Sequence, residues 1–328
     1  MKISNLAIAF ILIVTPFFLI MDLRTSALSN AEILSDQYDA ALKTANQDAA
    51  VMLNFNELQE YEAGYYSEKN FKANKELALD TFFRSLYLSF GVEDDSVGQG
   101  TLRSYIPVIV VTDYDGYWIY AMDEYEDETG QVIYKHMWKP KKPYAFTDSQ
   151  GNVFNFSLDG YTRVYQASTE TWLEGWQQDL AGNYDIDLLD NKENFEMQRR
   201  STIVDSIQND LAQVINKHNE YASKNGISYM FTLPYIPEED WTNTINDIGI
   251  ISFIQGIPIG EKFYNNYAFG SGRLIKNSVI IGGTDENTGI KYYYRNTCSF
   301  PYKEEETFDS EQEAAASGYF PKSCLNGQ

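Results

Sequence analysis

The most regular pattern of apolar positions lies in the second half of the chain. From about Lys192 to Lys224, a seam recurs at intervals of three and four residues, and it consists of Val204, Ile207, Leu211, Val214, His218 and Tyr221. This spacing is typical of one face of an α-helix. Asn225-Gly226 follows as a C-terminal stop signal. We therefore expect a long central helix here, with His218 as a core residue on its apolar face.

The N-terminal pattern predicts a second long helix. Residues 6–21, LAIAFILIVTPFFLIM, carry no charge, and 16 to 19 helical residues span roughly 24 to 29 Å, enough for a bilayer core. Apolar residues then continue at helical spacing to about residue 60, without Gly or Pro from Asp22 to Glu62. We expect a membrane helix that continues into an amphipathic helix. The alternative is a signal peptide cleaved near Thr25-Ser26-Ala27. Lys2 before the run favours export of the remainder.

Between these helices the pattern changes to strands. A helix is expected from about Phe71 to Phe90, ended by Gly91, and an acidic loop over 93–100 follows it. Residues 104–165 contain β-branched and aromatic runs separated by turn signals, of which Asp115-Gly116 is the strongest. Successive hairpins at this spacing predict an antiparallel meander. We interpret 112–116 as a hairpin turn and not as a calcium loop, because DxDG alone supplies too few oxygen ligands.

The last third is mixed. We expect a strand over Ser228–Leu233, a short helix near Glu238–Asp247, strands over Gly249–Ile259 and Ser278–Ile281, and a hairpin at 285–289. The fold class is therefore α+β. Five regions are expected, namely an anchor or signal segment (1–28), a helical region (29–91), an antiparallel β region (92–190), an α+β region (191–293) and a C-terminal loop (294–328). Whether 92–293 forms one domain or two, split near 165–190, stays open.

The composition of the chain excludes several classes of function. The chain has 328 residues, 47 acidic and 25 basic, and a formal net charge of −22. This charge repels phosphate backbones and argues against nucleic acid as a partner. A hydrophobic content of 44% argues against a disordered acidic tail. With two His and two Cys, and without a recognisable nucleophile motif, the sequence predicts a protein that is not an enzyme and needs no cofactor or metal.

One basic and aromatic segment stands out against this acidic background. The candidate ligand contacts are Trp138, Lys139, Lys141 and Lys142. Basic and aromatic side chains together suit an anionic polymer, such as a cell-wall phosphate polymer or an acidic glycan. The alternative is an intramolecular partner for the acidic cluster at 123–128, which lies one expected strand away.

The two cysteines, Cys298 and Cys324, predict one disulfide if the chain is exported, although free thiols remain an alternative. The segments 294–298, 308–315 and 318–324 resemble the small Ada-type zinc module, in which a helix precedes a Gly-Tyr-x-Pro turn and a closing pair of cysteines. Two of that family's four ligand positions are filled here. The resemblance implies a retained scaffold, with a helix over 310–316, a left-handed Gly318 and a disulfide in place of zinc.

The order of elements resembles that of type IV pilins and pseudopilins, including Tad-type pilin-like proteins. Those proteins join an apolar helix to an amphipathic continuation and an exported α+β head. The resemblance implies a single-pass bacterial cell-membrane protein, anchored through residues 6–21, with its C-terminal domain extracytoplasmic. We expect protein partners at the cell surface and a structural or interaction role as a pilin-like accessory subunit. The alternative is an extracytoplasmic module that binds a glycan or peptide ligand.

Overall fold

The structure is a computed structural model that describes residues 3–55, 67, 72–126, 128–224, 226–260, 262–272, 280–286, 288–295, 300–308 and 311–322. Within these ranges only the backbone is described for residues 3–14, 16–20, 242–243, 280, 295, 304 and 311–313. The chain divides into two compact units, Met1–Leu274 and Ile275–Gln328. Each unit has its own sheet, and the described parts of the fold are α+β with antiparallel strand pairing apart from one short parallel pair.

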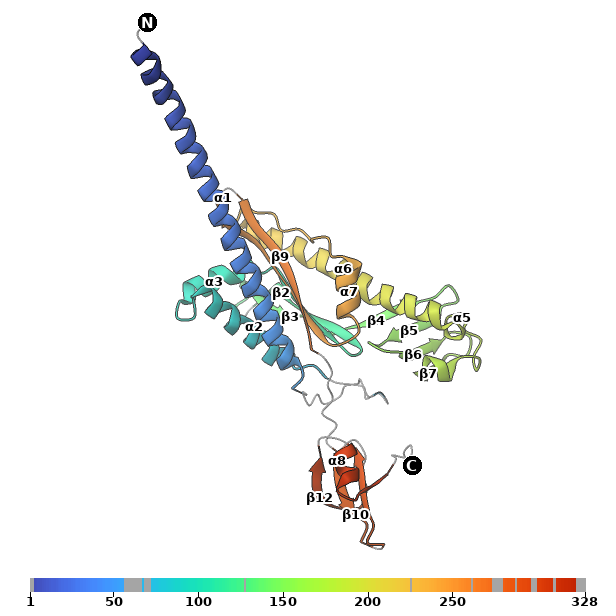
Figure 1. Cartoon of the computed structure of the whole chain (residues 1–328). Helices are drawn as coiled ribbons and strands as arrows, with labels where there is room; N and C mark the ends of the chain where they lie inside the picture. The colour runs from blue at the N-terminus through green and yellow to red at the C-terminus, as the bar shows by residue number, and fades with distance from the viewer. Residues whose placement is uncertain are drawn as a thin grey trace. The chain divides into compact units, whose positions relative to one another are not determined.

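The long helix α1 (Ile3–Leu53) runs without a break (Figure 1). Its residues 21–30 are exposed, whereas the turns from Ala31 onward pack against the rest of the larger unit. The residues of α1 that are fully buried there are Leu42, Ala45, Asn46, Ala49, Ala50 and Leu53. The expected amphipathic continuation is therefore confirmed, because the residues at helical spacing form the buried stripe.

Among the residues that the structure describes, no helix is both long enough and apolar enough to cross a membrane. The expected membrane segment, 6–21, belongs to the part of α1 for which almost only the backbone is described. Apart from Thr15 and Met21, its side chains thus lie outside the described residues.

The larger unit is built on a nine-stranded sheet in the order β7-β6-β5-β4-β2-β1-β8-β9, with β3 paired to β2. The strands are β1 (Val108–Asp113), β2 (Gly116–Glu126), β3 (Val132–Trp138), β4 (Lys142–Thr147), β5 (Val153–Phe156), β6 (Tyr161–Gln166), β7 (Thr171–Trp176), β8 (Gly249–Ile259) and β9 (Lys262–Ser271). The expected meander is confirmed, including the β1–β2 hairpin in which Asp113 pairs with Gly116. What the meander did not indicate is that β8, from far along the chain, pairs with β1.

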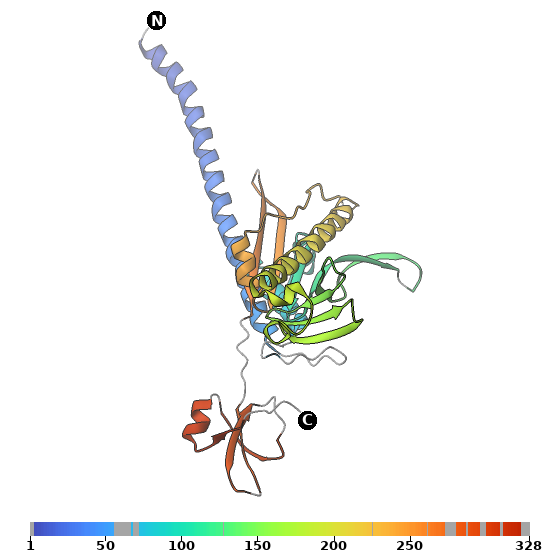
Figure 2. The same cartoon turned by 90° about the vertical axis from the view of Figure 1, so that its right-hand side faces the viewer.

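Helices cover both faces of this sheet (Figures 1 and 2). On one face α1 packs on β8 and β9, and α2 (Lys75–Phe90) lies beside α1. On the other face α6 (Lys192–Lys224) crosses β1, β2 and β4. The bounds of α6 match the expected central helix, and Gly91 ends α2 with a left-handed φ of 66°. His218 is 1% exposed, as expected of a core residue.

Short helices complete the larger unit. They are α3 (Ser96–Ser104), α4 (Gln177–Leu180), α5 (Asp187–Asp190) and α7 (Glu238–Thr244). The acidic loop expected over 93–100 is wrong in its second half, which belongs to α3. There the Asp95 side chain accepts a hydrogen bond from the Val97 N–H and caps the helix. A residue taken as a loop acid is thus an N-cap, the position at which Asp is most favoured.

The strand expected over Ser228–Leu233 is also wrong, because this segment joins no sheet in the described structure. Its backbone hydrogen bonds go to side-chain amides instead. The amide of Asn219 bonds both the N–H and the carbonyl of Phe231, and the amide of Gln255 bonds both those of Thr232. The segment thus has no partner strand, and Phe231 is its one buried residue, whereas Ser228, Met230 and Thr232 are exposed.

The smaller unit contains a four-stranded sheet in the order β12-β10-β11-β13. Its elements are β10 (Ile280–Thr284), β11 (Lys291–Arg295), β12 (Lys303–Phe308), α8 (Glu311–Ala316) and β13 (Phe320–Pro321). Phe308, Ala314 and Tyr319 form its buried core, and Gly318 has a left-handed φ of 83°. Cys298 and Cys324, the expected disulfide, lie outside the described residues.

Candidate functional site

The segment that joins β3 to β4 sends its basic and aromatic side chains to both faces of the sheet. Trp138 and Lys141 lie on the side of α2, where the Trp138 indole N–H donates to Glu76 at 3.0 Å. Lys139 and Lys142 lie on the side of α6, where they line a groove with residues of that helix. The four candidate ligand contacts therefore do not share one surface, although they lie within five consecutive positions of the chain, 138–142.

Lys141 is committed to a buried ion-pair cluster. Its ammonium lies 2.7 Å from Asp113 and 2.5 Å from Asp115, and 4.7 Å from the ring centre of Trp118. Asp113 also accepts a hydrogen bond from the Ala73 N–H. Burial raises the pKa of Asp113 to about 6 despite the nearby ammonium. Burial lowers the pKa of Lys141, but the two carboxylates outweigh this effect and raise it above its ordinary value. Since Asp113 is 1% exposed, this cluster fixes the β1–β2 turn and leaves Lys141 little freedom to meet a ligand.

The groove between the sheet and α6 has a volume of about 510 Å³. Its lining residues are Tyr117, Ile119, Asp123, Lys139, Pro140, Lys142, Asp210, Gln213, Val214 and Lys217. β2 supplies one wall, because Tyr117, Ile119 and Asp123 are two or four positions apart and share a face of the strand. One side of α6 supplies the other wall through Asp210, Val214 and Lys217, which are three or four positions apart.

At one end of the groove a single carboxylate holds two ammonium groups. Asp123 lies 2.8 Å from Lys139 and 2.5 Å from Lys217. Partial burial pushes the pKa of Asp123 upward, but the hydrogen bonds from the two lysines outweigh it and lower the pKa to about 2. We call Asp123, Lys139 and Lys217 the two-lysine end of the groove. For Lys139, this is the intramolecular pairing with the 123–128 cluster that the sequence left as an alternative.

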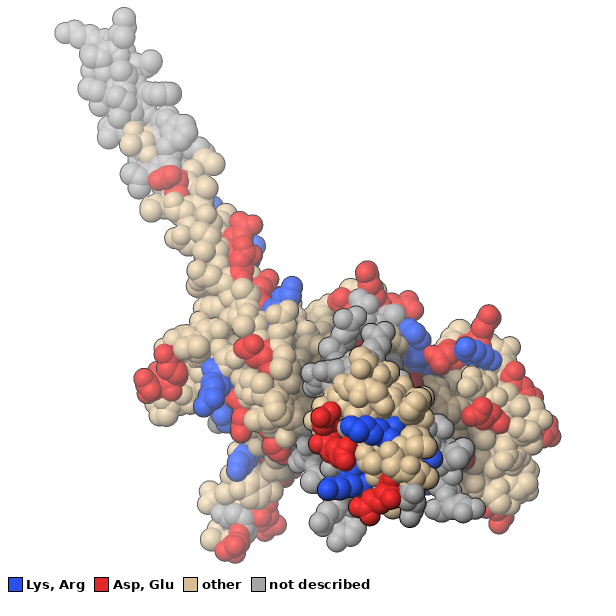
Figure 3. Space-filling model, turned by 60° about the horizontal axis from the view of Figure 1, so that its bottom comes forward, with Lys and Arg blue, Asp and Glu red and all other residues tan. Residues whose placement is uncertain are grey.

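At the other end the charges balance. Asp210 accepts a hydrogen bond from the Tyr117 hydroxyl at 2.8 Å and lies 2.7 Å from Lys142. Burial, together with the charge of Asp210, raises the pKa of Tyr117, which therefore stays a neutral donor. We call Asp210, Lys142 and Tyr117 the balanced end. Similar pairing is visible elsewhere on the surface, where basic side chains lie beside acidic ones (Figure 3).

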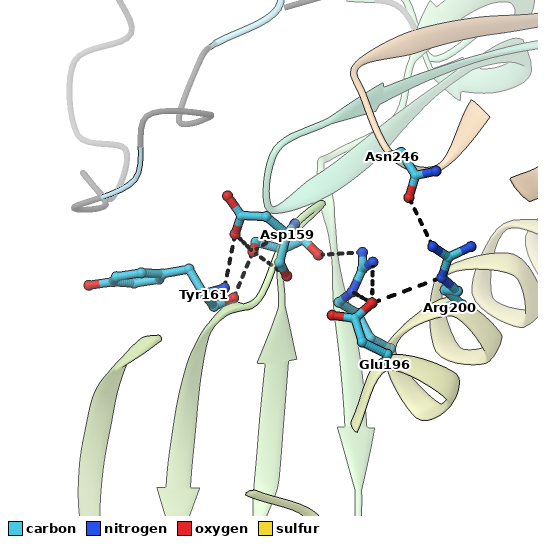
Figure 4. A network of polar contacts seen from close by, with 7 residues as sticks. Asp159, Tyr161, Glu196, Arg200 and Asn246 are labelled. Carbon is cyan, nitrogen blue, oxygen red and sulfur yellow. Dashed lines mark hydrogen bonds and ion pairs between the residues drawn. The ribbon is translucent and has the colours of Figure 1, made fainter. Parts of the chain in front are cut away.

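A second polar cluster closes the β5–β6 corner on the N-terminal part of α6 (Figure 4). Asp159 accepts hydrogen bonds from the Tyr161 N–H and from the hydroxyls of Tyr114 and Ser157, each at 2.9 Å. Arg199 donates to the Ser157 carbonyl and to Glu196, which also lies near Arg200. Every member of this cluster has a protein partner, so it joins the corner to the helix and is best explained as structural.

The sequence did not indicate Lys217 or Asp210 as site residues. Both lie on the polar flanks of a helix that was recognised for its apolar seam, and they meet Lys139 and Lys142 only because α6 crosses the sheet there. Among the described residues, no group of three or more His, Cys, Asp or Glu side chains is arranged to hold a metal ion.

No family model, curated protein or solved structure matches this chain.

Proposed function

We propose that this chain is an exported, membrane-anchored bacterial cell-surface protein with a structural or interaction role, comparable to an accessory subunit of a pilin-like assembly. The observation that carries the proposal is α1, a single helix of 51 residues. Its C-terminal turns are built into the core of the larger unit, while residues 21–30 are exposed on all sides. A helix that is fixed at one end and uncovered at the other is suited to carry a head away from its attachment point.

The distribution of charge supports the same proposal. Residues 6–21 carry no ionisable side chain, whereas the chain as a whole has a net charge of −22. Ionisable side chains are costly in a bilayer, so a run without them is compatible with insertion. An acidic head outside the membrane stays soluble and repels identical heads, which favours an ordered contact through the helix over unspecific association.

Membrane fractionation tests the anchor. We expect the full chain to sediment with membranes, to resist a high-salt wash and to keep its N-terminus. Placing two lysines in the uncharged run, as Ile13→Lys with Phe17→Lys, should release the protein from the membrane. Recovery of the wild-type chain in the salt wash, with its N-terminus removed, would show that the segment is a cleaved signal and would overturn the proposal.

Cysteine cross-linking in cells tests the assembly role. Leu28 lies on the uncovered part of α1 and is 61% exposed. If α1 makes the contact with partner subunits, Leu28→Cys should give a cross-linked species under mild oxidation. Val97→Cys is the matched control, because Val97 is 76% exposed but lies on α3, away from that part of α1. Equal cross-linking at both positions, or none at Leu28→Cys, would contradict an assembly role for α1.

A further inference from the structure

The groove beside α6 carries a local excess of positive charge. Its lining includes three lysines, Lys139, Lys142 and Lys217, but only two carboxylates, Asp123 and Asp210. The balance is therefore about +1 in a chain whose net charge is −22. Among the lining residues this excess is located at the two-lysine end, since each Asp neutralises one lysine and the balanced end has none left over; Glu124 and Glu220 act on Lys217 from outside the lining.

Between the two ends the groove is apolar. Asp210 and Lys217 are seven residues apart on α6, which separates the two ends by about 10 Å along the helix. Ile119, Pro140 and Val214 line the space between them. A cavity of about 510 Å³ lies within the range of small-molecule sites, roughly 300–1,000 Å³. The groove thus offers one cationic end, a short apolar floor and an electrically neutral far end.

We propose that this groove binds a small amphiphilic anion with a single anionic head group, a carboxylate or a phosphate, which contacts Lys139 and Lys217, and with a short aliphatic chain that covers Ile119 and Val214. A bare anion leaves the apolar floor uncovered, and a ligand with an anionic group at each end would bring the second group against Asp210. The complementary ligand therefore has one charged group and one apolar chain. This binding activity is independent of the anchoring role proposed above.

The two lysines have the donors that such a ligand requires. An ammonium group has three N–H donors, and within the described residues Lys139 and Lys217 each donate to one acceptor, Asp123. The side chain of Lys217 is 44% exposed, so its ion pair with Asp123 is of the solvent-screened kind that contributes little stability. A bound anion adds to these contacts and does not need to displace Asp123.

Isothermal titration calorimetry on the full-length chain in lipid nanodiscs tests the proposal, with empty nanodiscs as the blank. The probes are hexanoate, hexyl phosphate, hexanol and acetate. Hexanoate or hexyl phosphate should bind with one site per chain, and the tighter of the two identifies the preferred head group. Hexanol and acetate should each bind at least about tenfold more weakly, because each lacks one of the two contacts.

Two substitutions locate the binding site. Lys217→Gln removes one ammonium, and Gln213→Glu adds a like charge beside the ligand without changing the size of the side chain. Each should weaken binding of the tighter probe by about tenfold. Lys224→Gln is the matched control, because Lys224 lies on the same helix outside the groove and contacts Tyr134. The Lys224→Gln chain should bind the tighter probe with an affinity within about twofold of the wild type.

The three substituted side chains are exposed, so a change in binding should not result from a loss of folding. Gln213, Lys217 and Lys224 are all exposed on α6, so all three variants should melt at the wild-type temperature. If neither hexanoate nor hexyl phosphate binds, the proposal is overturned. So would equal affinities of Lys217→Gln and Lys224→Gln, or hexanol binding as tightly as hexanoate.

Discussion

Gly270 on β9 marks the place where α1 comes closest to the sheet. A Cβ atom on this residue would overlap the carbonyl oxygen of Asn46, and one on Gly272 would lie 2.8 Å from the carbonyl oxygen of Ala50. Alanines at 45, 49 and 50 provide the matching small side chains on α1. Asn46 uses the close approach to donate a hydrogen bond to Ser252 on β8 at 2.6 Å. Small residues on both sides thus let the helix lie directly on the strands.

Gly270→Ala should therefore push α1 away from the sheet. We expect a loss of about 1–3 kcal/mol in the free energy of unfolding, the usual range for overpacking a close contact. Chemical denaturation followed by circular dichroism measures it. Gly100→Ala on α3 is the control, since no atom lies within 4 Å of its added Cβ and Ala is the better helix former. A Gly270→Ala chain as stable as the control would show that α1 does not pack this closely.

His218 should make a measurable contribution to how the free energy of unfolding depends on pH. It is 1% exposed, its ring lies 4.5 Å from that of Phe231, and its Nδ1 has no hydrogen-bond partner among the described residues. Burial lowers its pKa to about 4. Because the folded pKa lies below the unfolded value of about 6.5, the neutral ring stabilises the fold fully above pH 6.5. This contribution is lost as the pH falls from 6.5 through 4.

The contribution of His218 amounts to roughly 3 kcal/mol, from about 1.4 kcal/mol for each pKa unit. We expect the unfolding free energy of the wild type to fall more steeply between pH 7 and pH 4.5 than that of His218→Asn. Comparing the two slopes cancels the carboxylates that titrate in the same window, including Asp113, whose raised pKa acts in the opposite direction. Parallel slopes would mean that His218 is not buried as a neutral ring.

At the level of elements, a feature of the fold could be predicted from the sequence where its signal lies within a few neighbouring residues. The α6 seam, the Gly91 stop and the Asp115-Gly116 turn each act within a few residues, and each was predicted with nearly the observed bounds. The pairing of β1 with β8 and the pairing of Lys217 with Asp123 join positions far apart in the chain. The candidate groove was therefore only half predictable: its β3–β4 lysines stood out, and its helix wall did not.

The segment 228–233 illustrates a different failure. Its composition indicated a strand, but β-propensity measures how well a residue suits a half-buried surface and not whether a partner strand exists. Here Asn219 and Gln255 take the role of that partner with one side-chain amide each. Phe231 is consequently buried, at 1% exposure, without belonging to a sheet.

Asn219→Ala should expose how much this segment depends on its amide contacts. The substitution leaves the N–H and the carbonyl of Phe231 without their partner, each now bonded at 2.7 Å. A buried polar group without a hydrogen bond costs about 1–3 kcal/mol, so we expect a loss of stability of that order. Hydrogen exchange at Phe231 should also become faster. Asn209→Ala, at an exposed position of the same helix, should change neither quantity.

At the level of the whole molecule, the two units have separate cores and can also be followed by separate experimental signals. All five tryptophans, at 118, 138, 172, 176 and 241, belong to the larger unit. Both cysteines belong to the smaller one. Tryptophan fluorescence therefore reports unfolding of the larger unit alone, while any effect of thiol chemistry begins in the smaller unit.

The smaller unit should depend more than the larger unit on a covalent link for its stability. It spans Ile275–Gln328, and among its described residues the buried hydrophobic cluster is Phe308, Ala314 and Tyr319, with Tyr293 packed against it. Domains of this size bury too little surface to be more than marginally stable. A disulfide between Cys298 and Cys324, which we predict from the sequence, would add on the order of 3 kcal/mol by restricting the unfolded chain.

Reduction should thus act on one unit only. With dithiothreitol, or in Cys324→Ser, we expect amide hydrogen exchange in β10 and β11 to accelerate by about 100-fold, which corresponds to the 3 kcal/mol above. The melting curve followed by tryptophan fluorescence should not move, because the larger unit keeps every contact of its own core. A shift of that curve would show that the units stabilise each other. Unchanged exchange in the smaller unit would instead show that the two thiols are free.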